Sequence, residues 1–200
     1  MKNIIKKIKS NRVLFILLFI TIISIIFGVL FLAIQNSDIK KQVNINLSDI
    51  LSAITNNKYN SFKVLFNSLK SNLLIGILIW LLGISIIGIP LILIAYIIKC
   101  IMLGFTISSF IYFYTFKGVL LGFIYLIPSI INIFILFVLV YYAIRFSLLL
   151  FENVFKRKDY NKRVVVKRYV KVLIISIILL LISSVIEGYV IPILLKLINF

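Results

Sequence analysis

Long runs of hydrophobic residues, separated by short polar or basic stretches, organise this chain. A helix that crosses a bilayer needs about 20 mostly apolar residues. The run from Val13 to Ile34 has no charged residue and follows a basic stretch that ends at Arg12. A cleaved signal peptide has an apolar region of only about 7–15 residues and a small-residue cleavage site, which Ala33-Ile34-Gln35 does not supply. The pattern predicts a retained transmembrane helix over 13–34.

The later apolar runs predict four more spans, at about 72–94, 100–116, 119–150 and 172–198. Pro90 removes a helix hydrogen bond and lies just after Gly88, so we expect a kink or break near Gly88-Ile89-Pro90. Residues 88–98 then form either a kinked helix or a re-entrant loop. Lys99 marks the turn into the third span. The whole chain, 1–200, is predicted to be a single all-α membrane domain, a polytopic bundle of about five transmembrane helices.

The segment 35–70, between the first two spans, carries two amphipathic patterns. Leu47, Ile50, Leu51 and Ile54 recur at helical spacing, as do Phe62, Leu65, Phe66 and Leu69. Asn56-Asn57 and Asn60-Ser61 separate the two patterns, and Ser61 is placed to cap the second. We expect two short amphipathic helices, which lie on the membrane or against a partner, or which pack on this chain's own bundle.

Composition and charge agree with a membrane protein and indicate its orientation. The chain is 63% hydrophobic and 14% charged, whereas soluble domains are about 45–50% apolar and about 25% charged. A net charge of +17 on a soluble chain would suggest nucleic acid, but here the basic residues flank apolar runs and are interpreted as topology signals. With an odd number of spans, the positive-inside rule places the N-terminus and the loop 156–171 in the cytoplasm, and the segment 35–70 outside.

The loop 156–171 is the most basic part of the chain. Its basic residues are Lys156, Arg157, Lys158, Lys162, Arg163, Lys167, Arg168 and Lys171. Each basic residue near an anionic leaflet contributes about 1 kcal/mol of binding. We therefore expect this loop to bind anionic lipid headgroups or an acidic partner, or to act only as a topology signal and anchor.

The residues that autonomous catalysis would need are scarce. The chain has no histidine and one cysteine, Cys100, which lies inside an apolar run. Histidine acid–base chemistry, Ser–His and Cys–His nucleophiles and most zinc sites are thereby excluded. The acidic residues are scattered, and no phosphate-binding G-x-x-x-x-G-K-[ST] loop occurs. We predict that the chain is not an enzyme and needs no cofactor or metal.

Glu187 is the carboxylate that lies deep in an apolar run. An ionised, lipid-facing carboxylate would cost several kcal/mol, so we expect Glu187 to face inward or toward water. Its candidate partners are Lys99, Arg145, a helix N-terminus opened by Pro192, or a group on another subunit. The side chain then serves either as a proton relay or as a structural pair or hydrogen-bonded acid.

Small and amide residues inside the spans favour contacts between helices. Gly118 and Gly122 form a G-x-x-x-G face that suits packing against another helix, in this chain or in a second copy of it. Asn72 and Asn132 are amides in apolar runs, and we expect them to hydrogen-bond across helices.

Four segments, in order along the chain, carry a resemblance to a known family. They are LIWLLGISIIGIP over 78–90, IKCIMLGFT over 98–106, LIP over 126–128 followed by Asn132, and IEGYVIP over 186–192. Together they resemble the stage II sporulation protein M family, multi-pass membrane proteins of endospore-forming bacteria. Cys100 stands where that family usually has glycine, and Asn132 lies further from the proline than in the family.

The resemblance implies a role in engulfment at the sporulation septum. It implies a non-enzymatic scaffold in the cell membrane that holds two septal peptidoglycan hydrolases, stage II sporulation proteins D and P. The residues we expect at partner or assembly contacts are Phe62, Leu65, Phe66, Lys99, Glu187, Gly118 and Gly122.

A second function follows from the family's distant similarity to permease subunits of ABC exporters. In that alternative the chain is a transport subunit that works with a separate ATPase. It would need a docking element, for which the loop 156–171 is the candidate, and a polar cavity lined by Glu187, Asn72 and Asn132.

Overall fold

The computed structural model describes residues 2–56, 60–85, 87–156 and 162–196, and these parts of the chain are helical with no strand. The elements are α1 (Lys2–Ile34), α2 (Ser37–Thr55), α3 (Ser61–Gly83), α4 (Gly88–Lys156), α5 (Lys162–Val185), the π-helical turn η1 (Ile186–Val190) and α6 (Ile191–Lys196). Four helical stretches are long and apolar enough to cross a membrane, namely Arg12–Ile34, Ser61–Gly83, Gly88–Asn153 and Arg163–Leu195.

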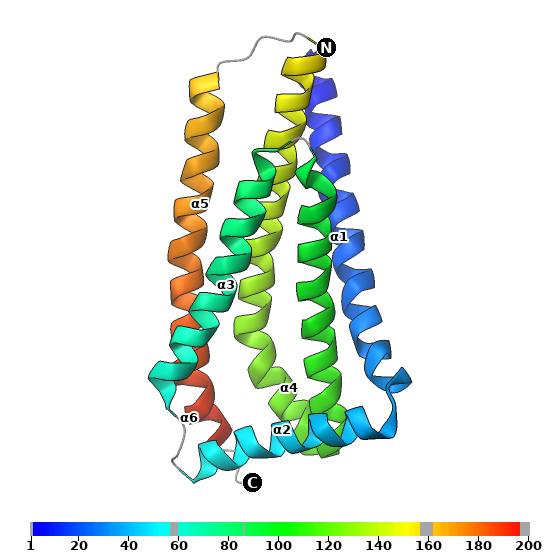
Figure 1. Ribbon diagram of the computed structural model, residues 1–200, viewed down its shortest axis with the longest axis vertical. Coiled ribbons are helices and arrows are strands. Elements are labelled where there is room, and N and C mark those ends of the chain that lie inside the picture. Colours follow the sequence, from blue (N-terminus) through cyan, green and yellow to red (C-terminus); the bar gives the residue numbers. More distant parts are fainter. Residues whose placement is uncertain (1, 57–59, 86, 157–161, 197–200) are drawn as a thin grey trace.

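Figure 1 shows a bundle in which α1, α3, the two arms of α4 and α5 run along the long axis, while α2 lies across one end. The start of α1, the end of α4 and the start of α5 share the opposite end. α4 reverses direction at Thr115, which has φ 46° and ψ −117°, so the four apolar stretches make five passes along the bundle. The predicted all-α polytopic fold is confirmed.

The outer surface of the bundle suits lipid rather than water. Of the apolar window in Arg12–Ile34, only 17% is buried inside the protein, and large side chains such as Phe15 and Phe19 are exposed. A soluble protein that exposed so continuous an apolar surface would associate through it. Because hydrocarbon surrounds a membrane helix, the same surface is stable there without a covering partner.

The predicted second span, 72–94, is wrong in its bounds because a turn interrupts it. α3 ends at Gly83 and α4 begins at Gly88, so the expected break near Gly88 is present. Residues 88–98 are neither a kinked helix nor a re-entrant loop but the first turns of the next pass. A Cβ at Gly88 would overlap with the Leu82 carbonyl, which explains how the chain turns so tightly. Pro90 is tolerated because the first turn of a helix needs no amide donor there.

The segment 35–70 also differs from the prediction of two short helices. The first pattern belongs to α2, but the second forms the opening turns of α3, which continues to Gly83. The cap is Asn60 rather than Ser61, because the Asn60 side chain accepts a hydrogen bond from the Lys63 backbone N–H at 3.0 Å.

α2 packs on the bundle of its own chain through one face only. Leu51 and Ile54 are buried in a cluster with Leu121, Ile191 and Leu195, which closes the end of the bundle. Ile39, Ile45 and Ile50 of α2 are exposed. At 3.6 residues per turn, Ile39 and Ile50 lie on one flank of α2 and Ile45 points roughly 120° or more away from both. Packing within the chain therefore accounts for part of the amphipathic pattern, and separate apolar side chains of α2 remain uncovered.

The basic segment 156–171 is mostly helix rather than a loop. α4 extends to Lys156 and α5 begins at Lys162, so the residues from Lys162 to Lys171 form the first turns of the last pass. The last predicted span, 172–198, correspondingly starts too late. Pro192 does not break it, because α5 continues through η1 into α6.

Three aromatic side chains join α3, α4 and α5 near the end opposite α2. The ring of Tyr169 lies between Phe146, at 4.3 Å between centroids, and Trp80, at 5.5 Å. The Tyr169 hydroxyl donates to the Trp80 carbonyl at 2.7 Å. A Cβ at Gly83 would overlap with that hydroxyl, so glycine is required for the close approach. We call Trp80, Phe146 and Tyr169 the aromatic junction.

Candidate functional site

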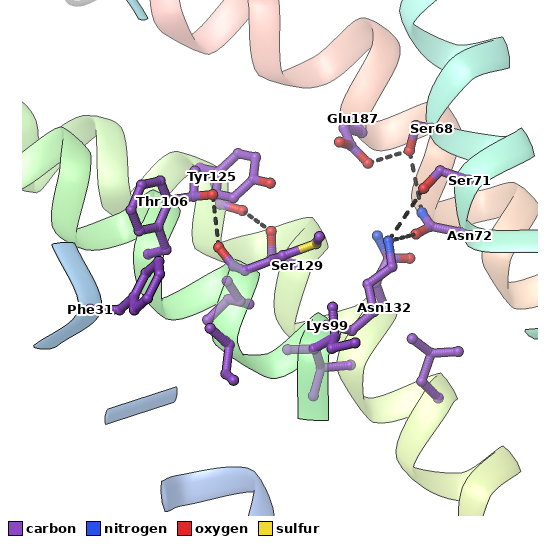
Figure 2. A pocket seen from close by; sticks show the side chains of 17 residues that line it. Phe31, Ser68, Ser71, Asn72, Lys99, Thr106, Tyr125, Ser129, Asn132 and Glu187 are labelled. Atoms are coloured by element: carbon purple, nitrogen blue, oxygen red, sulfur yellow. Dashed lines mark hydrogen bonds between the residues drawn. The ribbon is translucent and has the colours of Figure 1, made fainter. Parts of the chain in front are cut away.

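A cavity of about 620 Å³ lies inside the bundle, between α1, α3, both arms of α4 and η1. Cavities of about 300–1,000 Å³ are typical of small-molecule and cofactor sites. Its polar wall comes from α3, η1 and the middle of the first arm of α4, as Figure 2 shows. We refer to it as the central pocket. The residues that line it are Phe31, Ser68, Ser71, Asn72, Ile98, Lys99, Ile101, Met102, Leu103, Phe105, Thr106, Tyr125, Ser129, Asn132, Ile133, Leu136 and Glu187.

A chain of hydrogen bonds connects Lys99 to Glu187 along the polar wall (Figure 2). Lys99 Nζ donates to Asn72 Oδ1 at 3.2 Å, Asn72 Nδ2 donates to Ser68 Oγ at 3.4 Å, and Ser68 Oγ donates to Glu187. Lys99 Nζ also donates to Ser71 Oγ at 3.4 Å. In each hydrogen bond of this chain the donor lies on the Lys99 side and the acceptor on the Glu187 side. A positively charged ammonium at one end of the chain and a negatively charged carboxylate at the other favour this direction.

The structure brings the two predicted ionisable residues into one site. Glu187 is half-buried and faces the central pocket, as expected for a carboxylate in an apolar run. Of its candidate partners, Lys99 is the one that the hydrogen-bond chain reaches, whereas Arg145 lies over the ring of Tyr141 at 5.9 Å. Among the described residues, Lys99 and Glu187 form no direct ion pair, and Ser68 and Asn72 connect them.

Glu187 occupies the π-helical turn η1, where one residue more than usual is packed into the turn. Gly188 is buried directly against α3, and a Cβ there would lie 2.7 Å from the Leu65 Cβ. The missing side chain lets η1 approach α3 closely enough for Glu187 to reach Ser68. π-helical turns occur frequently at functional sites.

The two amides behave differently. Asn72 is buried and hydrogen-bonds across helices, as predicted. The prediction is wrong for Asn132, since its Oδ1 atom is buried and accepts no hydrogen bond from the residues that the structure describes. Asn132 lines the central pocket beside Lys99 (Figure 2), but its Oδ1 atom is itself buried.

Apart from the hydroxyls of Thr106, Tyr125 and Ser129, the rest of the pocket is apolar, and it reaches the outer surface of the bundle. Ile98 and Met102, one helical turn apart on α4, line the cavity and are 46% and 55% exposed. Phe31 of α1 lines it as well and is also exposed. These three residues, which we call the rim, form an edge of the pocket on the apolar outer surface.

The three predicted partner contacts on α3 differ in their exposure. Phe62 and Phe66 are 67% and 56% exposed and remain available to a partner. Leu65 is half-buried and packs against Gly188, so its role is structural within this chain.

Gly118 and Gly122 do not form an open face for another chain. Both are buried at the reversal of α4, where a Cβ at Gly118 would overlap with the Phe110 carbonyl. At Gly122 the nearest atom, Ile107 Cγ2, lies at an ordinary 3.6 Å. These glycines therefore pack the two arms of α4 against each other.

The predicted lipid-headgroup residues lie at the end of the bundle opposite α2. Arg163, Lys167 and Arg168 are exposed on the first turns of α5, at the same end as the start of α1 (Figure 1). α4 ends at Lys156, and α5 begins at Lys162. The predictions for Arg157 and Lys158 lie outside the described residues.

Sequence reasoning missed the serine that completes the site. Ser68, Ser71 and Asn72 share one face of α3, at the spacing that places polar groups side by side on a helix. That spacing was a usable signal, but the apparent start of the span at 72 concealed it. No group of three or more His, Cys, Asp or Glu side chains that could hold a metal occurs among the described residues.

The fold and the central pocket define a polytopic helical membrane protein whose intramembrane polar groups converge on one cavity. The model of the family "Stage II sporulation protein M" matches residues 15–192, which include most of each of the five passes and every residue of the pocket. The chain belongs to this family. Neither the curated proteins nor the solved structures contain a significant match to it.

Proposed function

We propose that this chain is a non-enzymatic membrane scaffold that positions septal peptidoglycan hydrolases during engulfment in endospore formation. Membership of the stage II sporulation protein M family supports a role in sporulation. The absence of histidine from the sequence, together with its single buried cysteine, supports a role without catalysis. The expected partners are stage II sporulation proteins D and P.

The observation that carries the proposal is the set of exposed apolar side chains on α2 and on the neighbouring start of α3. The buried residues Leu51 and Ile54 fix α2 against the bundle. Its exposed residues Ile39, Ile45 and Ile50 therefore keep fixed positions on the surface. Phe62 and Phe66 extend the same kind of surface onto α3. Exposed aromatic and aliphatic side chains on a rigid element are the typical energetic centre of a protein interface.

The proposal also includes an orientation. Among the residues that the structure describes, most basic positions lie toward the end of the bundle where α1 begins and α4 and α5 meet, so we place that end in the cytoplasm. α2 then lies on the outer face, where the septal wall and its hydrolases are. Labelling of single cysteines at Lys41 and Lys167 with a membrane-impermeant maleimide tests this, because only the first should react in intact cells.

The partner surface can be tested by site-specific crosslinking in a Cys100→Ala background. Single cysteines at Ile45, Ile50, Phe62 or Phe66 carry a short crosslinker during sporulation, and Ile178→Cys, an exposed position on α5, is the control. Hydrolase adducts are expected at the first four positions and not at Ile178. Adducts at none of the four, or equally at the control, would contradict the proposal.

Truncation of the two phenylalanines gives a second test. Phe62→Ala with Phe66→Ala should lower capture of the hydrolases by more than tenfold, as loss of two anchor residues does at other interfaces. Phe15→Ala with Phe19→Ala removes similarly exposed rings on α1 and should leave capture unchanged. Undiminished co-purification of both hydrolases with the Phe62/Phe66 variant would argue strongly against this surface.

One observation favours the second candidate function, a transport subunit that works with an ATPase. That function requires a polar cavity lined by Glu187, Asn72 and Asn132, and the central pocket has this lining. Its test is affinity purification with and without Lys167→Glu and Arg168→Glu at the basic end of the bundle. An ATPase that binds the unmodified chain and is lost from the variant supports transport, and recovery of no ATPase removes it.

A further inference from the structure

The central pocket combines a lysine, a carboxylate and an apolar opening, and nothing in the scaffold proposal uses this combination. We propose that it is a binding site for a zwitterionic membrane lipid whose headgroup carries a primary ammonium and a phosphate. The ammonium lies toward Glu187 and the phosphate toward Lys99. This inference concerns binding alone and does not depend on which proteins the chain recruits.

The charges of the pocket fit a ligand that is neutral overall and has two opposite poles. Lys99 and Glu187 face the same cavity but are separated by Ser68 and Asn72 along the wall. A purely anionic headgroup would gain from Lys99 and be repelled by Glu187, and a purely cationic ligand would experience the reverse. An ammonium and a phosphate on one headgroup satisfy both residues at once.

The hydrogen-bonding groups of Glu187 and Lys99 that have no partner among the described residues also indicate a headgroup with an ammonium and a phosphate. Ser68 donates to one oxygen of Glu187, and no described residue donates to the other. The N–H donors of a primary ammonium suit this second oxygen of Glu187, while Lys99, with two acceptors in Ser71 and Asn72, keeps one N–H for a phosphate oxygen.

The rim indicates that the ligand enters from the membrane. Phe31, Ile98 and Met102 line the cavity and are also exposed on the apolar outer surface of the bundle. A lipid can therefore place its headgroup in the pocket and leave its acyl chains along the rim in hydrocarbon. A water-soluble zwitterion would gain nothing from this apolar edge.

The binding test uses the full-length chain in nanodiscs with trace photoactivatable phosphatidylethanolamine, which carries a diazirine on its acyl chain. Unlabelled phosphatidylethanolamine, phosphatidylcholine and phosphatidylglycerol compete in separate samples. Phosphatidylethanolamine should compete best, because phosphatidylcholine has no ammonium N–H to donate and phosphatidylglycerol has no cation for Glu187. Equal competition by all three lipids would overturn the proposal.

Two charge variants with matched controls assign the two poles. Glu187→Gln should reduce phosphatidylethanolamine labelling about tenfold and abolish its advantage over phosphatidylglycerol, since a charge-assisted hydrogen bond is lost. Lys99→Met should reduce labelling by either lipid. Asp49→Asn and Lys41→Met make the same changes of charge on exposed helical surfaces and should label as the unmodified chain does. Unchanged labelling in both pocket variants would overturn the proposal.

A rim variant keeps the test valid if a charge variant fails to fold. Met102→Trp should fill the opening and reduce labelling, whereas Ile94→Trp, two turns away on the same helix and off the pocket, should not. Size-exclusion profiles, together with thermal unfolding followed by circular dichroism, show whether each variant is folded. Free O-phosphoethanolamine should show no saturable binding by calorimetry, and binding as tight as that of the lipid would overturn the assignment to a lipid.

Discussion

The aromatic junction and the central pocket join the same helices in opposite ways. At the junction, α3, α4 and α5 meet through stacked rings, and the Tyr169 hydroxyl is satisfied by the Trp80 carbonyl. At the pocket, α3, α4 and η1 surround a cavity of about 620 Å³ and are connected by hydrogen bonds between polar side chains. One region is closely packed, and the other holds space and unused acceptors.

This difference indicates how a small membrane bundle combines stability with a site. Helices in lipid gain no hydrophobic free energy from meeting each other, so close packing and hydrogen bonds must hold them together. The junction supplies close packing and needs glycine at position 83 to achieve it. Because that end holds the helices together, the region around Glu187 can remain open.

The largest expected effect is at the junction. Tyr169→Ala removes a buried ring between two others and should lower the free energy of unfolding by about 3–5 kcal/mol. Tyr169→Phe keeps the ring, loses only the hydrogen bond to the Trp80 carbonyl and should cost about 1 kcal/mol. Thermal unfolding in detergent, followed by circular dichroism, measures both. Similar stability of the two variants would show that the stacked rings of the aromatic junction do not stabilise this end of the bundle.

The next effect concerns the glycine that positions the pocket's carboxylate. Gly188→Ala places a Cβ 2.7 Å from the Leu65 Cβ and should separate η1 from α3, at a cost of about 1–3 kcal/mol. Gly122→Ala is the matched control, because the nearest atom lies at 3.6 Å and alanine favours a helix by about 1 kcal/mol over glycine. The control should be as stable as the unmodified chain or more so. If Gly188→Ala were as stable as the control, the close packing of η1 against α3 would not be needed for stability.

The hydrogen-bond chain predicts coupling between residues that do not touch. Lys99→Met and Glu187→Gln should show a coupling energy of about 0.5–3 kcal/mol in a double-mutant cycle of unfolding. The coupling should disappear in a Ser68→Ala background, because Ser68 is the link to Glu187. Additive single effects in the presence of Ser68 would mean that the two ends of the wall are independent.

The smallest expected effect is at Asn132, and its comparison with Asn72 distinguishes an amide that holds the helices together from one that does not. Asn72→Leu breaks two hydrogen bonds at a buried position and should destabilise the chain by about 1–3 kcal/mol. Asn132→Leu removes an acceptor with no donor among the described residues, so it should be neutral or slightly stabilising. Parallel melting curves of the two variants test this. Equal destabilisation would indicate that Asn132 is structural too.

The sequence allowed the fold class to be predicted because long apolar runs have few alternatives to membrane helices. It did not reveal the turn between Gly83 and Gly88, because residues 84–87 are nearly as apolar as the helices on either side. In water a turn is marked by polar residues, but in this run the composition does not change. The glycines at both ends were the remaining signal.

The site was predictable in part. An ionisable residue in an apolar run must face inward, and this principle identified Glu187 and named Lys99 among its partners. The connection through Ser68 and Asn72 depends on the π-helical turn and on the contact between Gly188 and Leu65. Such packing joins residues more than a hundred positions apart, which no local pattern encodes.

The central claim is that the bundle's intramembrane polar groups form one cavity that receives a lipid headgroup from the bilayer. The most direct measurement is mass-spectrometric mapping of the residues to which photoactivatable phosphatidylethanolamine attaches in the unmodified chain. Attachment concentrated around Phe31 and residues 98–102 is the predicted result. Attachment spread evenly over the exposed faces of α1 and α5, with none at the rim, would contradict the claim.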